Sequence, residues 1–165
     1  MVFEYCPKCG KKLDEKEIGD EGLVPFCFSC DNGWFSFSYP CVLCLVVDEN
    51  DNVVLTRGFE NTTGYYGGVA GYIKEGEAAE DAARREIEEE VGLIIDELKY
   101  MGSYCKNKDT LMLNFICKTK NAELKISEKE ISSAGWFPIN EAQNYLRQGS
   151  IIKHLLDDYL QSKNI

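Results

Sequence analysis

The sequence predicts an α+β fold in which helices pack on a mixed β-sheet, preceded by a small module without a hydrophobic core of its own. From residue 39 onward, apolar and helix-like segments follow one another in the order strands, helix, strands, helices, which favours a mixed sheet covered by helices. Residues 1–36 instead contain two closely spaced cysteine pairs and few aliphatic side chains. We therefore divide the chain into residues 1–36 and 37–165.

The elements of the larger region follow from local sequence patterns. The apolar run 41–47 predicts a buried strand, and the turn-forming residues 48–52 connect it to a second strand in a hairpin. A helix with one apolar face precedes Gly92, a residue typical of helix C-termini. The apolar face consists of Ala79, Ala83, Ile87 and Val91. The expected strands are 41–47, 53–55, 98–104 and 111–118, and the expected helices are 77–91, 139–147 and 151–160.

Composition and charge restrict the partners of the chain. It has 165 residues and a net charge of −10, which disfavours binding to nucleic-acid backbone or anionic lipid. A phosphorylated substrate would therefore need local positive charge, for which a divalent cation is the obvious source. No apolar run reaches membrane-spanning length, and the N-terminus lacks the pattern of a signal peptide. These features predict a cytoplasmic protein without membrane contact.

The predicted helix ends in a cluster of glutamates. Glu86, Glu89 and Glu90 are spaced to share one face, whereas Glu88 points away from them. The cluster lies where the helix dipole is already negative, and only Arg85 is placed to offset Glu89 at i+4. A solvated acidic face is the ordinary alternative for such a run. Three convergent carboxylates, however, also suit a hard divalent cation such as Mg²⁺ or Mn²⁺.

The segment from Gly71 to Leu93 resembles the Nudix box, the signature of a family of pyrophosphohydrolases. All nine specified positions match at the required spacing over 23 residues, and they are Gly71, Glu77, Arg85, Glu86, Ile87, Glu89, Glu90, Gly92 and Leu93. The resemblance implies an α/β/α sandwich with a mixed sheet, spanning about residues 39–165. It also implies Mg²⁺- or Mn²⁺-dependent hydrolysis of the pyrophosphate bond in a nucleoside diphosphate derivative.

The same resemblance implies roles for individual residues. Glu86, Glu89 and Glu90 are expected to bind the metal, together with the Gly71 carbonyl, and Glu77 contributes through the metal shell. Arg85 is expected to orient the glutamates by ion pairing. Two candidates remain for the general base, namely Glu89 in the box and Glu130 on a later loop.

The first four cysteines have the spacing of a structural zinc site. Two Cys-x2-Cys pairs are separated by seventeen residues, and they comprise Cys6, Cys9, Cys27 and Cys30. This arrangement resembles a zinc ribbon, although two disulfides are the alternative. Cys41 and Cys44 repeat the local spacing but lie in an apolar strand, where residues three apart face opposite sides. We therefore expect these two cysteines to be buried structural residues.

The predicted zinc ribbon has a poor charge for binding nucleic acid. Residues 1–36 contain four lysines and seven acidic residues, a net charge of −3. A structural role, or a role in forming a homodimer, is therefore expected for this module.

The substrate is the least determined feature. A zinc ribbon ahead of a Nudix box, and Val69-Ala70-Gly71 leading into it, resemble the NADH pyrophosphatase branch. That branch carries a Ser-Gln-Pro-Trp motif after the box, and residues 101–106 lack it. The proline that marks many ADP-ribose hydrolases is also missing from residues 107–109. The substrate therefore stays open among NAD(H), ADP-ribose and related dinucleotides.

Aromatic and arginine side chains are the expected contacts to such a nucleotide-type substrate. Aromatic rings stack on bases and arginine pairs with phosphates, although core packing explains each ring equally well. The candidates are Arg57, Phe59, Tyr65, Tyr66, Tyr104 and Trp136. Two other functions compete with this one, hydrolysis of unwanted nucleoside triphosphates and a nucleotide-sensing module without turnover. The complete set of box glutamates argues against the sensor.

Overall fold

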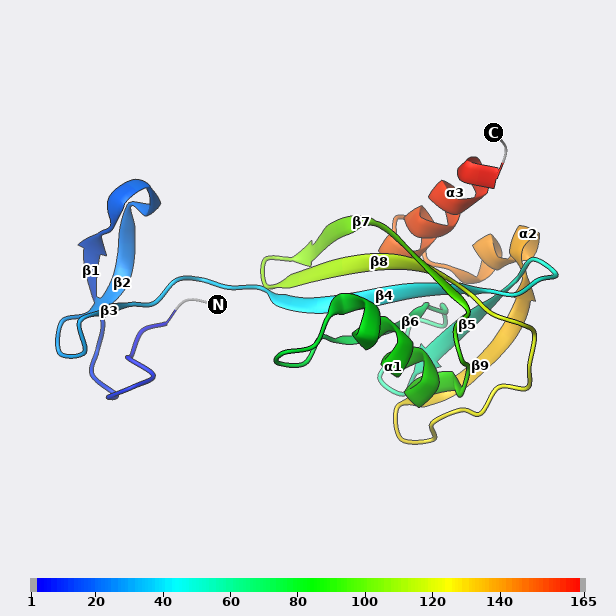
Figure 1. The fold of residues 1–165 in the computed structure, drawn as a ribbon, viewed down its shortest axis with the longest axis horizontal. Helices are drawn as coiled ribbons and strands as arrows, with labels where there is room; N and C mark the ends of the chain where they lie inside the picture. Colours follow the sequence, from blue (N-terminus) through cyan, green and yellow to red (C-terminus); the bar gives the residue numbers. More distant parts are fainter. Residues whose placement is uncertain (1–2, 164–165) are drawn as a thin grey trace. The chain divides into compact units, whose positions relative to one another are not determined.

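The computed structural model describes residues 3–163, and the chain forms two compact units, Met1–Ser38 and Tyr39–Ile165 (Figure 1). The smaller unit is built on a three-stranded antiparallel sheet in the order β1-β2-β3. Its elements are β1 (Asp14–Glu17), the 3-10 helix η1 (Gly19–Glu21), β2 (Leu23–Cys27) and β3 (Asn32–Gly33). Its small core combines Cys6, Leu13 and Cys27 with Trp34, so cysteines occupy positions that aliphatic residues fill in larger domains.

The larger unit contains a mixed six-stranded sheet, as the sequence predicts. Its strands are β4 (Tyr39–Val47), β5 (Asn52–Gly58), β6 (Val69–Tyr72), β7 (Glu97–Asn107), β8 (Thr110–Lys118) and β9 (Ile131–Pro138). The order is β7-β8-β4-β5-β9, with β6 also paired to β4. The pairing of β4 with β8 is parallel, and the other pairings of these six strands are antiparallel. The predicted hairpin is confirmed by the antiparallel pairing of Val46 with Val54.

Helices cover both faces of this sheet (Figure 1). The helical elements are α1 (Ala79–Val91), α2 (Ile139–Ala142), the 3-10 helix η2 (Gln143–Tyr145) and α3 (Ile151–Lys163). The apolar face of α1 packs on one side of β4 and α3 packs on the other, which explains why β4 is apolar at successive positions. Cys41 and Cys44 are buried in these two different cores, as predicted. Within residues 3–163, no helix is long and apolar enough to cross a membrane.

The structure departs from the predicted elements in a few places. The helix expected from residue 77 begins at Ala79, because Glu77 closes the preceding turn by accepting the backbone N–H of Lys74. The helix expected over 139–147 stops at Ala142 and continues as the 3-10 turn η2. Strands β6 and β9 are not among the predicted strands. The sequence Ile-Ser-Ser-Ala-Gly of β9 alternates poorly, and pairing with β5 rather than local pattern fixes it as a strand.

Candidate active site

Gly71 and Glu86 form the junction between β6 and α1. Gly71 lies on the face of β6 that meets α1, and a Cβ atom at this position would overlap the carboxyl group of Glu86. The absence of a side chain therefore lets the helix bring its carboxylate directly against the strand. The Gly71 backbone and the Glu86 carboxylate are thus neighbours, which is the arrangement needed if both are to bind one cation.

This junction gives a first testable prediction. The substitution Gly71→Ala displaces the Glu86 carboxylate, the flexible end of its side chain, while the backbone of β6 keeps its pairing with β4. We expect kcat to fall by on the order of a hundredfold, because a misplaced group loses that much rate. The melting temperature should change by only a few degrees. A matched Ala70→Gly variant tests the neighbouring position, and unchanged kcat in Gly71→Ala would contradict the prediction.

Arg85 joins three glutamates of the box into one ion-pair network. Its Nε and Nη2 atoms donate to the two carboxylate oxygens of Glu77 at 2.7 and 2.8 Å. Its Nη1 atom donates to Glu86 at 2.6 Å and to Glu89 at 3.0 Å. The hydrogen bonds to Arg85 lower the pKa of Glu77 to about 2, and those to Glu77 raise the pKa of Arg85. Arg85 therefore fixes the orientation of Glu86 and Glu89.

Glu90 is the buried acid of the cluster. Its side chain has no ion pair in the described part of the chain, and the residue is only 9% exposed. Burial, followed by the charges of Glu86 and Glu130, raises the pKa of Glu90 to about 8, opposed by a hydrogen bond from the Ala70 backbone. Glu90 is thus a desolvated carboxylate without a cationic partner beside Glu86, and such a pair of acids suits a hard divalent cation.

The box carboxylates share one region but do not form a closed coordination sphere. Among residues 3–163, the cysteine cluster is the only group of three or more metal-type ligands whose donor atoms all lie within 4.8 Å. Like charges repel, and the carboxylate of Glu89 is occupied by ion pairs with Arg85 at 3.0 Å and with Lys74 at 3.8 Å. The carboxylates that could bind a cation thus lie on one face of α1. Glu86 and Glu90 are the two that point into the protein.

The burial of Glu90 makes stability depend on pH. Because its pKa is raised in the folded state, the folded chain holds a proton that the unfolded chain releases at lower pH. The contribution to stability is complete below about pH 4.5 and is lost as pH rises through about 8. In buffer without Mg²⁺ or Mn²⁺, we expect the free energy of unfolding, measured by urea titration, to fall over this window by up to about 5 kcal/mol. A Glu90→Gln variant should lack this component, and an identical pH profile would contradict the assignment.

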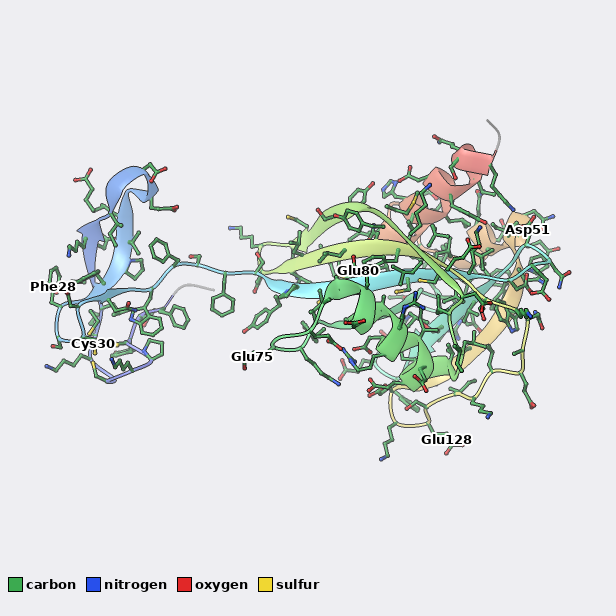
Figure 2. All side chains as sticks on the ribbon, in the orientation of Figure 1. Phe28, Cys30, Asp51, Glu75, Glu80 and Glu128 are labelled. Atoms are coloured by element: carbon green, nitrogen blue, oxygen red, sulfur yellow. The ribbon has the colours of Figure 1, made fainter. Side chains whose placement is uncertain are left out.

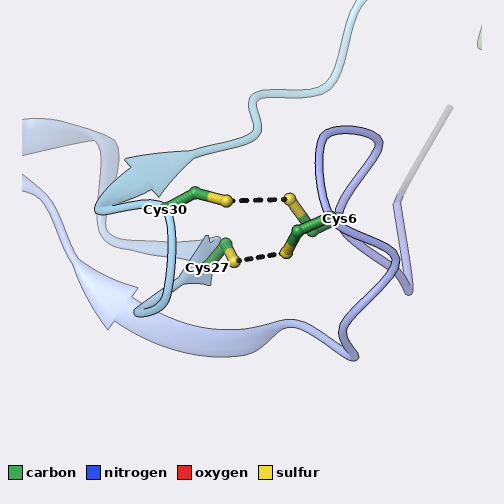
Figure 3. A group of neighbouring side chains, drawn as sticks. Cys6, Cys27 and Cys30 are labelled. Carbon is green, nitrogen blue, oxygen red and sulfur yellow. Dashed lines mark hydrogen bonds between the residues drawn. The ribbon is translucent and has the colours of Figure 1, made fainter.

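The four cysteines of the smaller unit also converge, and Figure 3 labels three of them, Cys6, Cys27 and Cys30. Their sulfur atoms all lie within 4.8 Å of one another, with Cys9 and Cys27 at 3.6 Å and Cys6 and Cys30 at 3.9 Å. These distances are far longer than the ~2.05 Å of a disulfide, and all the cysteines are reduced. The alternative of two disulfides is therefore not what the structure contains. Four thiols on two tight turns instead fit a tetrahedral metal site.

Ionisation within this cluster is uneven. Burial opposes ionisation of Cys6, but hydrogen bonds from the backbones of Cys9 and Lys8 lower its pKa to about 6. The hydrogen bond with Cys9 raises the pKa of Cys30 to about 12. The site thus favours one thiolate and resists further negative charge, as expected for four sulfurs that need a cation to ionise together.

A cleft of about 660 Å³ opens on the face of the sheet opposite α1. Its lining residues are Leu43, Gly67, Gly68, Ala70, Cys105, Lys106, Met112, Arg147, Gln148, Gly149, Ser150, Ile151 and Ile152. Ala70 lines the cleft, whereas the next residue, Gly71, faces Glu86. The cleft and the carboxylate cluster are therefore adjacent across β6.

The cleft carries positive charge of its own. Lys106 and Arg147 belong to its lining, and α3 begins there. The Ser150 hydroxyl accepts the backbone N–H of Lys153 at 3.4 Å at the start of this helix, where the helix dipole is positive. None of these residues is among the sequence-predicted contacts. Gly149-Ser150 before an apolar helix is the local sequence pattern that could have indicated the cleft, but nothing in the sequence shows that Lys106 lies near it.

The predicted substrate contacts do not line this cleft, and most of them make contacts within the protein. Arg57 stacks on Tyr66, with its guanidinium carbon 4.2 Å from the ring centre, and donates to the Gly64 carbonyl. Tyr66 packs against Phe137 and Tyr145. Trp136 donates its indole N–H to the Ala122 carbonyl at 2.9 Å.

The remaining candidates lie at the surface. Phe59 is exposed in a shallow groove that also includes Glu128 (labelled in Figure 2) and Ile131. The neighbouring acid Glu130, the candidate base, precedes β9, and its charge reaches Glu90. Tyr65 is also exposed, and Tyr104 reaches Asp158 with its hydroxyl at 3.4 Å. Phe59, Trp136 and Glu130 are thus predicted residues on the side of the sheet that carries α1.

Comparison with known proteins identifies the family. Residues 38–159 match the family model described as NUDIX domain. The chain therefore belongs to the Nudix hydrolases. It is similar to proteins named NAD-capped RNA hydrolase NudC, with 31% identity over 94% of this chain to that of Pseudomonas fluorescens. The corresponding protein of Vibrio cholerae is 26% identical over 97% of this chain. The matches cover 55% and 58% of those two proteins, so the chain spans about half the length of these curated relatives.

Solved structures share the fold. A NUDIX hydrolase from Nitrosomonas europaea superposes with a TM-score of 0.76 and 18% identity, covering 98% of this chain and 93% of that one. The NUDIX domain of Shewanella oneidensis NrtR, crystallised with ADP ribose, gives a TM-score of 0.68 and 14% identity over 78% of this chain and 90% of its own. At this level of identity the likeness concerns the fold alone.

Proposed function

We propose that this protein hydrolyses the pyrophosphate bond of a nucleoside diphosphate derivative, with an NAD(H)-type dinucleotide as the favoured substrate. The observation that carries the proposal is the junction at β6, where Gly71 meets the carboxylates and Ala70 opens into the basic cleft. A pyrophosphate placed across β6 would contact both the carboxylate cluster and the basic cleft. The relatives named NAD-capped RNA hydrolase support a dinucleotide, free or at the end of an RNA.

The chemistry needs a divalent cation, for which Mg²⁺ or Mn²⁺ fits the oxygen donors. Glu86, Glu90 and the Gly71 carbonyl would hold it, with Glu89 completing the set and Glu77 acting through Arg85. When bound, the cation neutralises phosphate charge and acidifies the attacking water. In the same proposal, Cys6, Cys9, Cys27 and Cys30 bind Zn²⁺, which stabilises the smaller unit.

Glu130 is the proposed general base that removes the proton from the attacking water. It is exposed, and within residues 3–163 it has no ion pair, whereas Glu89 contacts both Arg85 and Lys74. A carboxylate that is already paired is a weaker proton acceptor. The proximity that raises the pKa of Glu90 also places Glu130 on the cluster side of the sheet. It ends the long connection between β8 and β9, so its approach to the cluster need not disturb α1.

The part of the substrate beyond the pyrophosphate is proposed to occupy the cleft. Lys106, Arg147 and the first turn of α3 would face the phosphate oxygens, and Leu43, Met112 and Ile152 offer apolar surface for the ring beyond them. These positive charges attract an anionic substrate locally, although the chain has a net charge of −10. An anion can therefore bind here although the chain as a whole repels it.

A substrate panel tests the proposal. The protein is incubated with Mg²⁺ or Mn²⁺ and NAD⁺, NADH, ADP-ribose, an NAD-capped RNA oligonucleotide and nucleoside triphosphates, and the products are resolved. Release of two mononucleotides from NAD(H) supports the proposal. Pyrophosphate release from triphosphates alone would instead favour the housecleaning hydrolase. Binding without any product would indicate the sensor.

The two candidate bases are distinguished by paired variants. We expect Glu130→Gln to lower kcat by on the order of 10²–10⁴-fold, the usual contribution of a general base, and to remove the acidic limb of the pH–rate profile. Affinity for Mn²⁺, measured by titration calorimetry, should hardly change. Glu89→Gln should weaken Mn²⁺ binding instead. The assignment is wrong if Glu130→Gln keeps the pH profile of the wild type.

A further inference from the structure

Asn114 in β8 is a buried polar residue that the fold does not use. Its side chain is completely buried, and neither the amide oxygen nor the amide nitrogen has a hydrogen-bond partner among residues 3–163. Buried amides are nearly always paired, because removing one from water without a partner is unfavourable. The residues on either side of it on the same face of the strand, Met112 and Ile116, are apolar core residues. Packing alone would therefore favour an apolar side chain at this position.

Asn114 lies beside two residues of the cleft lining, on the same face of the sheet. Its partner on β4 is Leu43, and the preceding residue on its face of β8 is Met112. Both of these residues line the cleft. On the other side its partner in β7 is Gly102, which has no side chain, and a Cβ atom there would meet nothing within 4 Å. Asn114 is thus a lateral neighbour of two cleft residues without itself lining the cleft, and Gly102 leaves open space beside it.

One of these two neighbours, Met112, is able to change its conformation. Met112 is unbranched and has three rotatable bonds, so it can change rotamer at small energetic cost. A ring that enters between Leu43 and Ile152 would displace the Met112 side chain and bring its polar edge toward the asparagine amide. Asparagine offers one acceptor and two donor hydrogens in a plane. That pattern complements a flat group carrying a neighbouring donor and acceptor.

We propose that Asn114 is a specificity-determining residue that reads the polar edge of the substrate's terminal ring, a donor–acceptor pair such as that of a carboxamide or an amino-substituted base. The inference rests on the proposed function, because it assumes that the cleft holds one end of a dinucleotide. A site that hydrogen-bonds such groups strongly rejects an analogue without them, because the buried polar groups of the site then stay unpaired. Asn114 would thus lower the stability of the fold and contribute to recognition of the substrate.

The test compares substrate discrimination in the wild type and in Asn114→Leu. The substrates are NAD⁺, the analogue with nicotinic acid in place of nicotinamide, and the analogue with hypoxanthine in place of adenine. We expect the wild type to prefer NAD⁺ over one analogue by at least about tenfold in kcat/KM, and that analogue shows whether the carboxamide or the base is read. In Asn114→Leu the preference should fall below about twofold, mainly through KM, while the melting temperature rises.

A matched control separates recognition from packing. Ile116→Val alters the next residue on the same face of β8, which lies in the core and outside the cleft lining. It should lower the melting temperature and leave the preference unchanged. Equal discrimination by the wild type and Asn114→Leu, with NAD⁺ hydrolysed by both, would overturn the inference and leave the proposed function standing. A wild type that hydrolyses none of the three dinucleotides would overturn both.

Discussion

Glu90→Gln is expected to lower kcat by on the order of 10³-fold while the protein stays folded. Glu90 is the buried acid at the centre of the carboxylate cluster, held in place by the Ala70 backbone N–H. Glutamine keeps the shape and the acceptor oxygen but removes the negative charge that a cation would meet. A loss of this size corresponds to ~4 kcal/mol of transition-state stabilisation. The measurement is steady-state hydrolysis of NAD⁺ at saturating Mg²⁺, with Mn²⁺ affinity determined separately.

Glu88→Gln is the control for this variant. Glu88 lies on the same turn of α1 but is exposed and faces away from the cluster, so the same chemical change removes the same formal charge outside the site. We expect kcat to stay within about twofold of the wild type, as surface substitutions usually have small effects. Without divalent cations, Glu90→Gln should in addition be more stable than the wild type at pH 8. Activity near the wild-type level in Glu90→Gln would remove the central ligand from the proposal.

The elements predicted correctly are those whose own sequence determines them. The continuous apolar run of β4 is buried on both faces of the sheet. In α1, apolar residues recur every four positions and form one face, and the helix ends at Gly92, which has the left-handed conformation. Periodicity and a terminal glycine are local signals. β6 has four residues and β9 a weak pattern, and each exists because a neighbouring strand supplies its hydrogen bonds. Such pairing depends on contacts that local sequence does not encode.

The same distinction applies to the candidate site. The glutamates and Arg85 lie within one helix and the turn before it, so their spacing in the sequence gives their arrangement in space. The cleft instead combines segments near residues 43, 67–70, 105–112 and 147–152. Only the pairing of β4 with β6 and β8 brings the first three together. The partners of Tyr66 and Trp136 within the protein also depend on the fold, so the sequence alone does not reveal them.

Cys27→Ser is expected to unfold the smaller unit and to leave the larger unit folded. The core of the smaller unit consists mainly of the cysteines themselves, Leu13 and aromatic rings such as Trp34, so it has too little apolar surface to fold alone. Zinc binding to four cysteines supplies about 10–16 kcal/mol in small zinc modules at neutral pH. The variant should lose its zinc, measured by elemental analysis, and hydrogen exchange should become fast throughout β2.

The two units can be followed separately because each contains one of the two tryptophans, Trp34 and Trp136. Their emission should respond differently: in Cys27→Ser the Trp34 component shifts to the wavelength of a solvated indole, while the Trp136 component keeps that of a folded core. The matched control is Cys105→Ser, which changes an exposed cysteine outside the four-cysteine cluster and should retain one zinc per chain. Full zinc content and slow exchange in β2 of Cys27→Ser would show that this cluster is not what holds the smaller unit together. Fast exchange in β4 as well would mean that the larger unit depends on the smaller one for its own stability.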